Sequence, residues 1–349
     1  MRAMRHDCHQ LLHLLALMIG VGGTVVGSVA YAAHEVVPVV DLHVDISYQV
    51  NYKHRDIERV SGQFVANRLV LAGVVGLVLP LYVPHEVSPE GPRLVDLEAS
   101  WATMFGLTQR TAPYNPPGSA QEPGRVATWF ALEGAAPFAG HPEWVAKWVA
   151  QGVRIWGLVH VHDNALATSA GLGPGRLKHD VGLSPEGHQL VQAIHAAHAL
   201  VDVSHASDRT VEDILEHARR DGVPVIATHS NANRLAPHAR NLTDAQLYAI
   251  AATGGVIGVN FHGNFLARDR TATLDDVVQQ IRYMAGLVGA EHVALGSDYE
   301  GGIRPPPELR DVRGYQRLAS ALRSSGFSAS DVRRIFSDNV LALLRTTQK

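Results

Sequence analysis

The chain has 349 residues, of which 46% are hydrophobic and 18% are charged, and its formal net charge is −3. This composition excludes an intrinsically disordered chain, which would be poor in apolar residues and rich in charge. With 30 basic against 33 acidic residues, it lacks the basic excess that binding to a phosphate backbone requires, so we expect no nucleic-acid partner. A single cysteine, Cys8, excludes an intramolecular disulfide and a thiolate zinc site, whereas 20 histidines offer many imidazole ligands.

Residues 1–33 have the layout of a secretory signal peptide. A basic start precedes an apolar run from Leu11 to about Val29, and the small-residue exit Ala30–Ala32 follows. The alternative is a retained N-terminal membrane anchor, because the apolar run is nearly long enough to span a bilayer. We therefore expect a periplasmic or secreted protein whose folded domain covers residues 34–349. It associates with a membrane only if this segment is left uncleaved.

Eight β-forming runs follow in the rest of the chain, and each is nearly continuous in apolar residues. They are Val36–Asp45, Val74–Val83, Val126–Leu132, Val153–His160, Leu200–His205, Val223–His229, Gly255–Phe261 and His292–Asp298. Continuous apolar runs are typical of parallel strands that are covered on both faces.

Helical spacing appears between several of these runs. The predicted helices are Pro185–Ala199, Ser207–Arg220, Thr243–Ala252, Leu274–Gly289 and the amphipathic Asp331–Leu344, with a further helix around Leu94–Leu107 inside the long loop Pro84–Gly124. Eight strands interleaved with helices indicate an α/β fold, a single (β/α)8 TIM-like barrel. A doubly wound open sheet is the structural alternative.

Six of the eight runs finish in histidine or an acidic residue at their C-terminal side. The residues concerned are His43, Asp45, Glu133, His160, His205, His229 and Asp298. One histidine at a strand end is more often a hydrogen-bonded rim residue than a ligand, but barrel active sites are built at this end of the strands. Charged groups that meet there are costly unless something neutralises them, and a divalent cation does so.

The ligand set contains nitrogen and oxygen donors, which suits zinc, with manganese, cobalt and iron as alternatives. Three histidines and two acids exceed one tetrahedral site, so we expect two ions that share a carboxylate. His195 and His198 lie on a predicted helix, where we expect surface or packing roles. His262 follows the seventh run, and the sequence leaves open whether it lines the pocket.

These residues resemble the membrane (renal) dipeptidase family of binuclear zinc peptidases. The similarity runs from about Val39 to Leu344, and its longest matching segment is PVIATHSNANRLAPHARNLTD. The other matching segments are Asp41–Asp45, Ala131–Gly134, Leu158–Asn164, Val201–Ser207 and His292–Gly301. The resemblance implies an amidohydrolase-like barrel that holds two zinc ions per chain.

The resemblance also implies roles for single residues. His43 and Asp45 would hold one ion, His205 and His229 would hold the other, and Glu133 would bridge the two. His160 would contact the substrate carbonyl region, Arg240 would bind the substrate's terminal carboxylate, and Asp298 would transfer the proton. The chain departs from the family pattern at Leu42, Val44, Tyr299, Glu300 and Asp338, which leaves its substrate preference open.

We therefore expect a zinc-dependent dipeptidase that hydrolyses the peptide bond of dipeptides through a metal-bridging hydroxide. One alternative is another metal-dependent amidohydrolase that acts on N-acyl amino acids or lactones, although neither Lys147 nor Lys178 lies at a strand end to act as a bridging lysine. The other alternative is a non-catalytic periplasmic metal-binding protein. The expected partner is a small dipeptide substrate, and a homodimer is left open.

Overall fold

The computed structural model of the chain describes residues 36–56, 62–64, 66–85, 87, 91–117, 124–173, 175, 177, 179–267 and 270–347. Val36–Lys349 form one compact unit. The signal peptide or anchor expected at residues 1–33 lies outside the described residues. Among the helices of the described part, none has the length and apolar character that crossing a membrane requires.

Eight parallel strands form a closed barrel in chain order, from β1 to β8. Their bounds are β1 Val39–Asp41, β2 Val74–Leu81, β3 Ala127–Glu133, β4 Val153–Gly157, β5 Leu200–Asp202, β6 Val225–Ala227, β7 Val256–Val259 and β8 Val293–Leu295. The pairing of Asp41 with Leu295 joins β1 to β8 and closes the ring. The TIM-like barrel is confirmed, and the open-sheet alternative is excluded.

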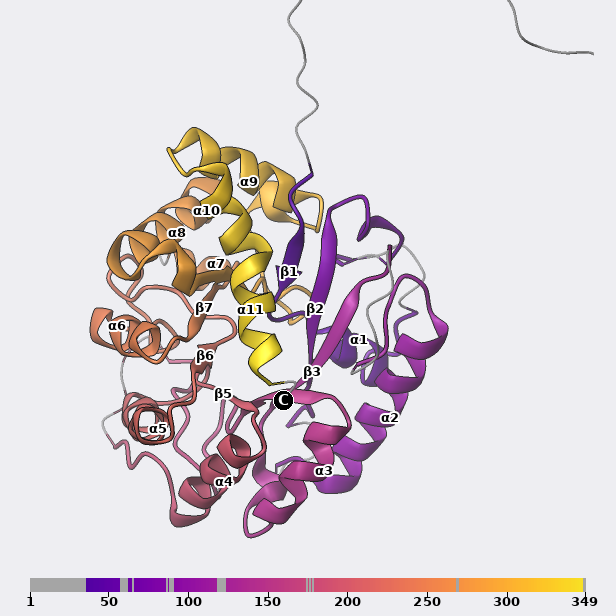
Figure 1. Cartoon of the computed structure of the whole chain (residues 1–349), viewed down its shortest axis with the longest axis vertical. Helices are drawn as coiled ribbons and strands as arrows, with labels where there is room; N and C mark the ends of the chain where they lie inside the picture. The colour runs from indigo at the N-terminus through magenta and orange to yellow at the C-terminus, as the bar shows by residue number, and fades with distance from the viewer. Residues whose placement is uncertain are drawn as a thin grey trace, which may run out of the picture. The chain divides into compact units, whose positions relative to one another are not determined.

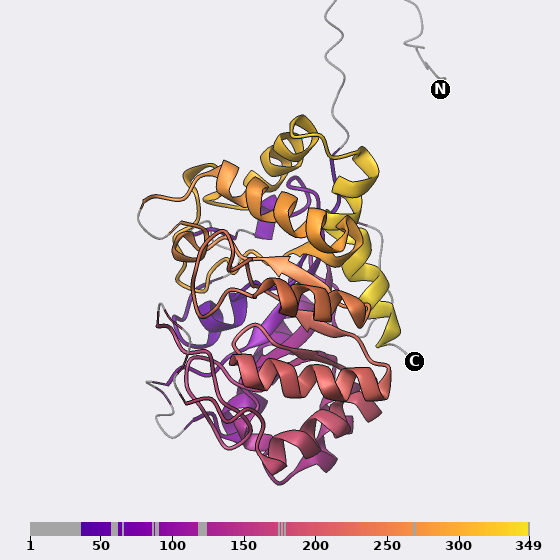
Figure 2. The ribbon, with the colours of Figure 1, turned by 90° about the vertical axis from the view of Figure 1, so that its left-hand side faces the viewer.

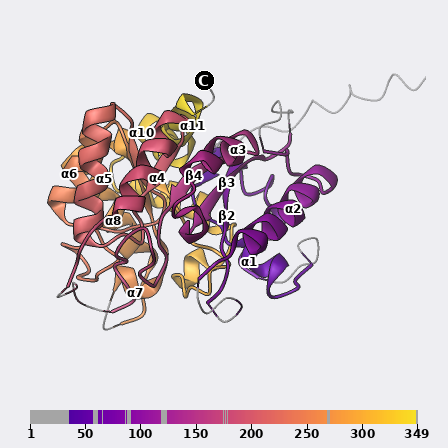
Figure 3. The ribbon, with the colours of Figure 1, turned by 90° about the horizontal axis from the view of Figure 1, so that it is seen from below.

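Helices surround the barrel (Figures 1 and 3). They are α1 Ile46–Asn51, α2 Leu94–Arg110, α3 Val145–Ala150, α4 Pro185–Ala196, α5 Asp208–Asp221, α6 Asp244–Ala252, α7 Gly263–Leu266, α8 Leu274–Val288, α9 Gly314–Ser324, α10 Ala329–Arg333 and α11 Asn339–Thr346. Several begin at side-chain caps that the sequence supplies. Ser184 accepts a hydrogen bond from the Gly187 amide, and Ser207 accepts one from Thr210.

The barrel has two apolar layers, one inside the ring of strands and one between the strands and the outer helices, several of which are seen side by side in Figure 2. The inner layer includes Val40, Ile155 and Ile226, which are fully buried. It also includes Leu343 and Leu344 of α11, and Figure 1 shows this helix crossing in front of the strands. The C-terminal helix therefore completes the packing of the barrel interior.

The predicted C-terminal helix is present, but it is not α-helical throughout. A π-helical segment, Arg334–Asp338, separates α10 from α11. Directly after it, the Asn339 side chain donates hydrogen bonds to the carbonyls of Ala290 and Val293, at 2.8 Å each. These bonds connect the start of α11 with β8 and the turn before it. Local periodicity in the sequence cannot reveal such a contact between distant segments.

Candidate metal centre

The strands place the predicted site residues at one end of the barrel, although most of these residues lie just beyond the hydrogen-bonded strands. Glu133 is the last residue of β3, whereas His43 follows β1 and His229 follows β6. His205 and Asp298 likewise come after β5 and β8. Because all eight strands are parallel, their C-terminal ends point the same way and bring these side chains together.

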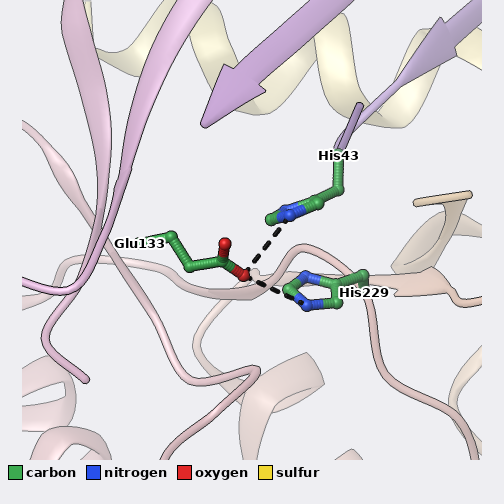
Figure 4. Close-up of side chains that lie close together, drawn as sticks. All are labelled: His43, Glu133 and His229. Carbon is green, nitrogen blue, oxygen red and sulfur yellow. Dashed lines mark ion pairs between the residues drawn. The ribbon is translucent and has the colours of Figure 1, made fainter. Parts of the chain in front are cut away.

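One oxygen of Glu133 is the point on which the histidines converge. Its Oε1 lies 3.0 Å from the Nε2 atom of His205, 3.4 Å from that of His43, 3.6 Å from that of His229 and 3.8 Å from that of His160. Figure 4 shows His43 and His229 reaching this oxygen from different strands. A single carboxylate oxygen cannot accept good hydrogen bonds from four imidazoles at once. Some of these imidazole nitrogens are therefore left without a good hydrogen bond to Glu133.

The two aspartates lie on the His43 side of this cluster. Asp45 Oδ2 is 3.6 Å from His43 Nε2, and ligand atoms of His43, Asp45 and Asp298 all lie within 4.8 Å of one another. The space beside the two carboxylates requires a glycine, because a Cβ on Gly301 would overlap an oxygen of each. The sequence therefore keeps this position free of a side chain so that the carboxylates can approach.

Three overlapping groups of donor atoms could each hold a metal ion. The first is His43, Glu133 and His229, the second is Glu133, His160 and His205, and the third is His43, Asp45 and Asp298. Glu133 is shared by the first two groups, and His43 is shared by the first and third. The arrangement thus extends over more than one ion's coordination sphere.

The residues present fit a divalent cation. His43 Nε2 is buried and has no hydrogen-bond partner among the described residues, although it points at the carboxylates. A buried nitrogen lone pair without a donor is costly unless a cation accepts it. The donors are imidazole nitrogens and carboxylate oxygens, the combination that borderline divalent metals such as zinc prefer.

Burial sets the protonation of this site. Desolvation, together with the positive charge of Arg240, lowers the pKa of His43 to about 3 and the pKa values of His205 and His229 well below their usual range. The imidazoles are therefore neutral at pH 7, as metal ligands must be. Desolvation and the charge of neighbouring carboxylates raise the pKa values of Asp45 and Glu133 well above their usual range.

Arg240 is the cation of the site. Its side chain is 2% exposed, and its Nη2 atom lies 3.2 Å from His205 Nε2. Within the part of the chain that the structure describes, its Nε and Nη1 atoms are buried without hydrogen-bond partners, and the guanidinium lies 5.7 Å from the centre of the Phe265 ring. A buried guanidinium with free donors is arranged to bind an anion such as a carboxylate.

Asp298 lies on a turn of unusual backbone conformation. Its φ is 64°, and that of Glu300 is 71°, a left-handed region that residues other than glycine seldom adopt. The Asn260 side chain donates a hydrogen bond of 3.0 Å to Asp298 Oδ2. Desolvation raises the pKa of Asp298 to about 6, which suits a group that accepts and returns a proton near neutral pH.

These groups line a cavity of about 320 Å³ at the C-terminal end of the barrel. All of the predicted site residues except His43 line it, and His262, which the sequence left open, lines it as well. Sequence reasoning missed the aromatic wall of the cavity, formed by Tyr48, Tyr82 and Phe265. These residues come from loops and short helices after the strands, where no periodic signal marks them.

His195 lies away from this cavity, as expected for a packing residue. It is buried, and its Nδ1 atom pairs with Asp221 at 2.8 Å. It belongs to α4, on the outside of the barrel.

The barrel, its buried cluster of histidines and carboxylates, and the guanidinium beside them fit a metal-dependent hydrolase. The model of the membrane dipeptidase family (peptidase family M19) matches residues 29–349. The chain belongs to this family, and its class is that of a metallopeptidase.

Three relatives illustrate the similarity. An uncharacterised protein of Klebsiella pneumoniae is 38% identical over 219 residues, which are 61% of this chain and 79% of that protein. An uncharacterised dipeptidase of Schizosaccharomyces pombe and a dipeptidase of Aspergillus oryzae are each 32% identical over 64% of this chain. The aligned segments span 54% and 52% of those two dipeptidases, about half of their length.

Solved structures share the fold over nearly the whole domain. The dipeptidase AC, a metallopeptidase of family M19, is 25% identical, with a TM-score of 0.80 over 90% of this chain and 99% of that one. A metallopeptidase of Rhodobacter sphaeroides, solved with a phosphinate mimic of the dipeptide L-Ala-D-Ala, is 24% identical, also with a TM-score of 0.80. It covers 90% of this chain and 100% of that one.

Proposed function

We propose that the protein hydrolyses the peptide bond of dipeptides with two zinc ions bound at the His43–Glu133–His229 end of the barrel. The observation that carries the proposal is the convergence of four imidazole Nε2 atoms on one oxygen of Glu133, within 3.8 Å. In this proposal His43 and Asp45 would hold one ion, His205 and His229 would hold the other, and Glu133 would contribute to both. His229 also contacts His43, with 3.7 Å between ring centres, so the two halves of the centre are in direct contact.

Bound cations would lower the pKa of a water molecule toward ~7 and polarise the substrate carbonyl. The protein's own groups do the rest. Asp298 accepts the proton of the attacking water and returns it to the leaving amine, a role that its pKa of about 6 supports. His160, whose ring lies 4.4 Å from that of His205, donates a hydrogen bond to the carbonyl oxygen as negative charge develops there.

Arg240 selects the substrate in this proposal. Its Nε and Nη1 donors, which have no hydrogen-bond partner among the residues described above, would form a charge-assisted pair with the free C-terminal carboxylate of the dipeptide. A buried cation binds that carboxylate in preference to a neutral amide, since an uncharged partner leaves the guanidinium's charge uncompensated. Short substrates with a free C-terminus are therefore favoured.

Dipeptide hydrolysis by the purified protein tests the proposal. The rate is measured on a panel of dipeptides, N-acyl amino acids and lactones, before and after removal of metal with a chelator and after zinc is added back. We expect hydrolysis of dipeptides that chelation abolishes and zinc restores. Hydrolysis of N-acyl amino acids or lactones without any dipeptide turnover would overturn it, as would metal binding without hydrolysis.

Export and assembly are proposed from the sequence pattern. We propose that residues 1–33 direct the chain to the periplasm or the exterior and are then removed. Sequencing the N-terminus of the protein recovered from the producing cell tests this, because a retained segment would indicate an anchor instead. Light scattering of the purified protein decides whether it forms a homodimer.

A further inference from the structure

One hydroxyl group lies behind two of the candidate ligands. Thr228, the residue before His229, is fully buried. Its Oγ1 atom is 2.8 Å from the Nδ1 atom of His229 and 3.2 Å from that of His43. In both rings Nδ1 lies on the side away from Glu133, because Nε2 is the atom that faces the carboxylate. Thr228 thus contacts two histidines that come from different strands.

The hydroxyl proton of Thr228 takes part in a hydrogen bond to Asp202. Its hydroxyl donates to Asp202 Oδ2 at 2.5 Å, and the Thr228 amide donates to Asp202 Oδ1 at 3.0 Å. Ser204 donates its own hydroxyl proton to Asp202 Oδ1 at 2.6 Å, so it cannot donate to Thr228. Towards His43 and His229 the Thr228 oxygen can therefore act as an acceptor, using its two lone pairs.

The hydrogen bonds of Thr228 determine the tautomer of both rings. An acceptor beside Nδ1 requires a proton on Nδ1, and a neutral imidazole that carries its proton there has a lone pair on Nε2. We propose that Thr228, held by Asp202, is a positioning residue that fixes His43 and His229 in the Nδ1–H tautomer. Both Nε2 lone pairs are then directed at the metal centre before any ion binds. The inference rests on the proposed function, in which these two histidines serve different ions, so that one hydroxyl supports both sites.

His205 differs from the other two histidines. Its Nδ1 atom is buried and has no hydrogen-bond partner in the described ranges of the chain. Its Nε2 atom lies 3.0 Å from Glu133 and 3.2 Å from Arg240. It also lies 3.0 Å from His229 Nε2, so the contacts of this ring are made through Nε2, and the direct contribution of Thr228 is to His43 and His229.

Three variants test the inference. Thr228→Val removes the hydroxyl and keeps the shape of the side chain, whereas Thr228→Ser keeps the hydroxyl. Thr108→Val is the matched control, because Thr108 is also fully buried but lies on α2, where its hydroxyl donates to the Phe105 carbonyl. If Thr228→Val does not fold, Thr228→Ala replaces it, and circular dichroism verifies the fold of each variant.

The first measurement uses the metal-free protein labelled with nitrogen-15 in histidine. Two-bond proton–nitrogen correlation spectra distinguish the Nδ1–H from the Nε2–H tautomer. We expect two histidines, assigned with His43→Gln and His229→Gln, to be in the Nδ1–H form in the wild type, the Ser variant and the Thr108→Val control. In Thr228→Val both should shift toward the Nε2–H form that free imidazole prefers. Unchanged tautomers in Thr228→Val would overturn the inference.

The second measurement is zinc affinity, determined by competition with a coloured chelator. Loss of such a supporting contact weakens metal binding about 10–100-fold, and we expect this loss at both ions in Thr228→Val, with affinity restored in Thr228→Ser. Zinc affinity in Thr228→Val equal to that of the wild type would contradict the inference. If the wild type itself binds no zinc, the proposed function fails, while the tautomer spectra of the metal-free protein still decide the role of Thr228.

Discussion

The chemistry of the centre depends on side chains whose burial changes their protonation. Neutral imidazoles and carboxyl groups of raised pKa share one cavity with the guanidinium of Arg240, whose pKa burial lowers to about 10. Each of these groups would be unfavourable without the others. Asp298 and Arg240 are the two for which single substitutions separate catalysis from binding.

Asp298→Asn should keep the shape of the side chain and remove its ability to accept a proton. We expect kcat to fall by about 10²–10⁴-fold, as is typical when a general base is lost. Bound metal, counted by mass spectrometry of the metal content, should be unchanged. A variant that turns over dipeptides at nearly the wild-type rate would show that Asp298 does not transfer the proton.

Arg240→Ala should weaken substrate binding through the lost carboxylate contact. A hydrogen-bonded charge pair contributes about 1.5–3 kcal/mol, so KM for dipeptides should rise about 10–100-fold. The matched comparison is the same dipeptide with a C-terminal amide, which the wild type should bind poorly and the variant should bind no worse. An unchanged KM for the free acid would contradict the role of Arg240 as a carboxylate clamp.

The positions of the eight strands could be predicted from the sequence, but their lengths could not. All eight predicted strands are present because runs such as Val74–Val83 and Val126–Leu132 are nearly continuous in apolar residues. Strand lengths were overestimated: β6 is only Val225–Ala227, and His229 follows it in a loop. Apolar content does not reveal where ladder hydrogen bonds stop, because the loop residues at the top of the barrel are also buried.

The parts that could not be predicted depend on contacts between distant segments. The acceptor that Thr228 offers to His43 joins residues 185 positions apart, and the Asn260 contact with Asp298 joins residues 38 apart. Neither has a spacing that periodicity detects. The candidate ligands could be predicted because each lies next to a recognisable strand, and parallel strands bring such positions together whatever their separation along the chain.

The element that completes the barrel interior gives a stability prediction. Leu344 of α11 is 1% exposed within the inner apolar layer, so Leu344→Ala should lower the free energy of unfolding by about 2–5 kcal/mol. Leu71→Ala is the matched control, because Leu71 is 81% exposed and its loss should cost far less. Chemical denaturation measures both, and equal effects would show that α11 does not pack as described.

At the scale of the whole molecule, the carboxyl groups at the C-terminal end of the barrel favour their protonated forms in the metal-free protein. Desolvation raises the pKa of Asp298 to about 6 and the pKa values of Asp45 and Glu133 further. A group whose pKa is raised by folding stabilises the fold below its unfolded pKa and loses that contribution as the pH rises through the folded value. The free energy of unfolding of the metal-free protein should therefore be lower at neutral and higher pH. Bound cations should offset the negative charge of the carboxylates under these conditions.

Metal uptake should consequently release protons and strengthen as the pH rises. We expect zinc binding at pH 7 to release protons from the carboxyl groups, with none from the histidines, which are already neutral. Calorimetry in buffers of different ionisation enthalpy measures this release. The gain in Tm on adding zinc should grow as the pH is raised through about 6. Zinc binding without proton release, or a gain in Tm that shrinks with rising pH, would contradict these pKa directions.

The proposed mechanism requires two cations that share Glu133, and anomalous diffraction at the zinc absorption edge tests this directly. A crystal of the zinc-loaded protein should show two anomalous peaks per chain, one on each side of the Glu133 carboxylate. One peak should lie beside His43 and Asp45, and the other beside His205 and His229. A single peak, or peaks away from Glu133, would contradict the account.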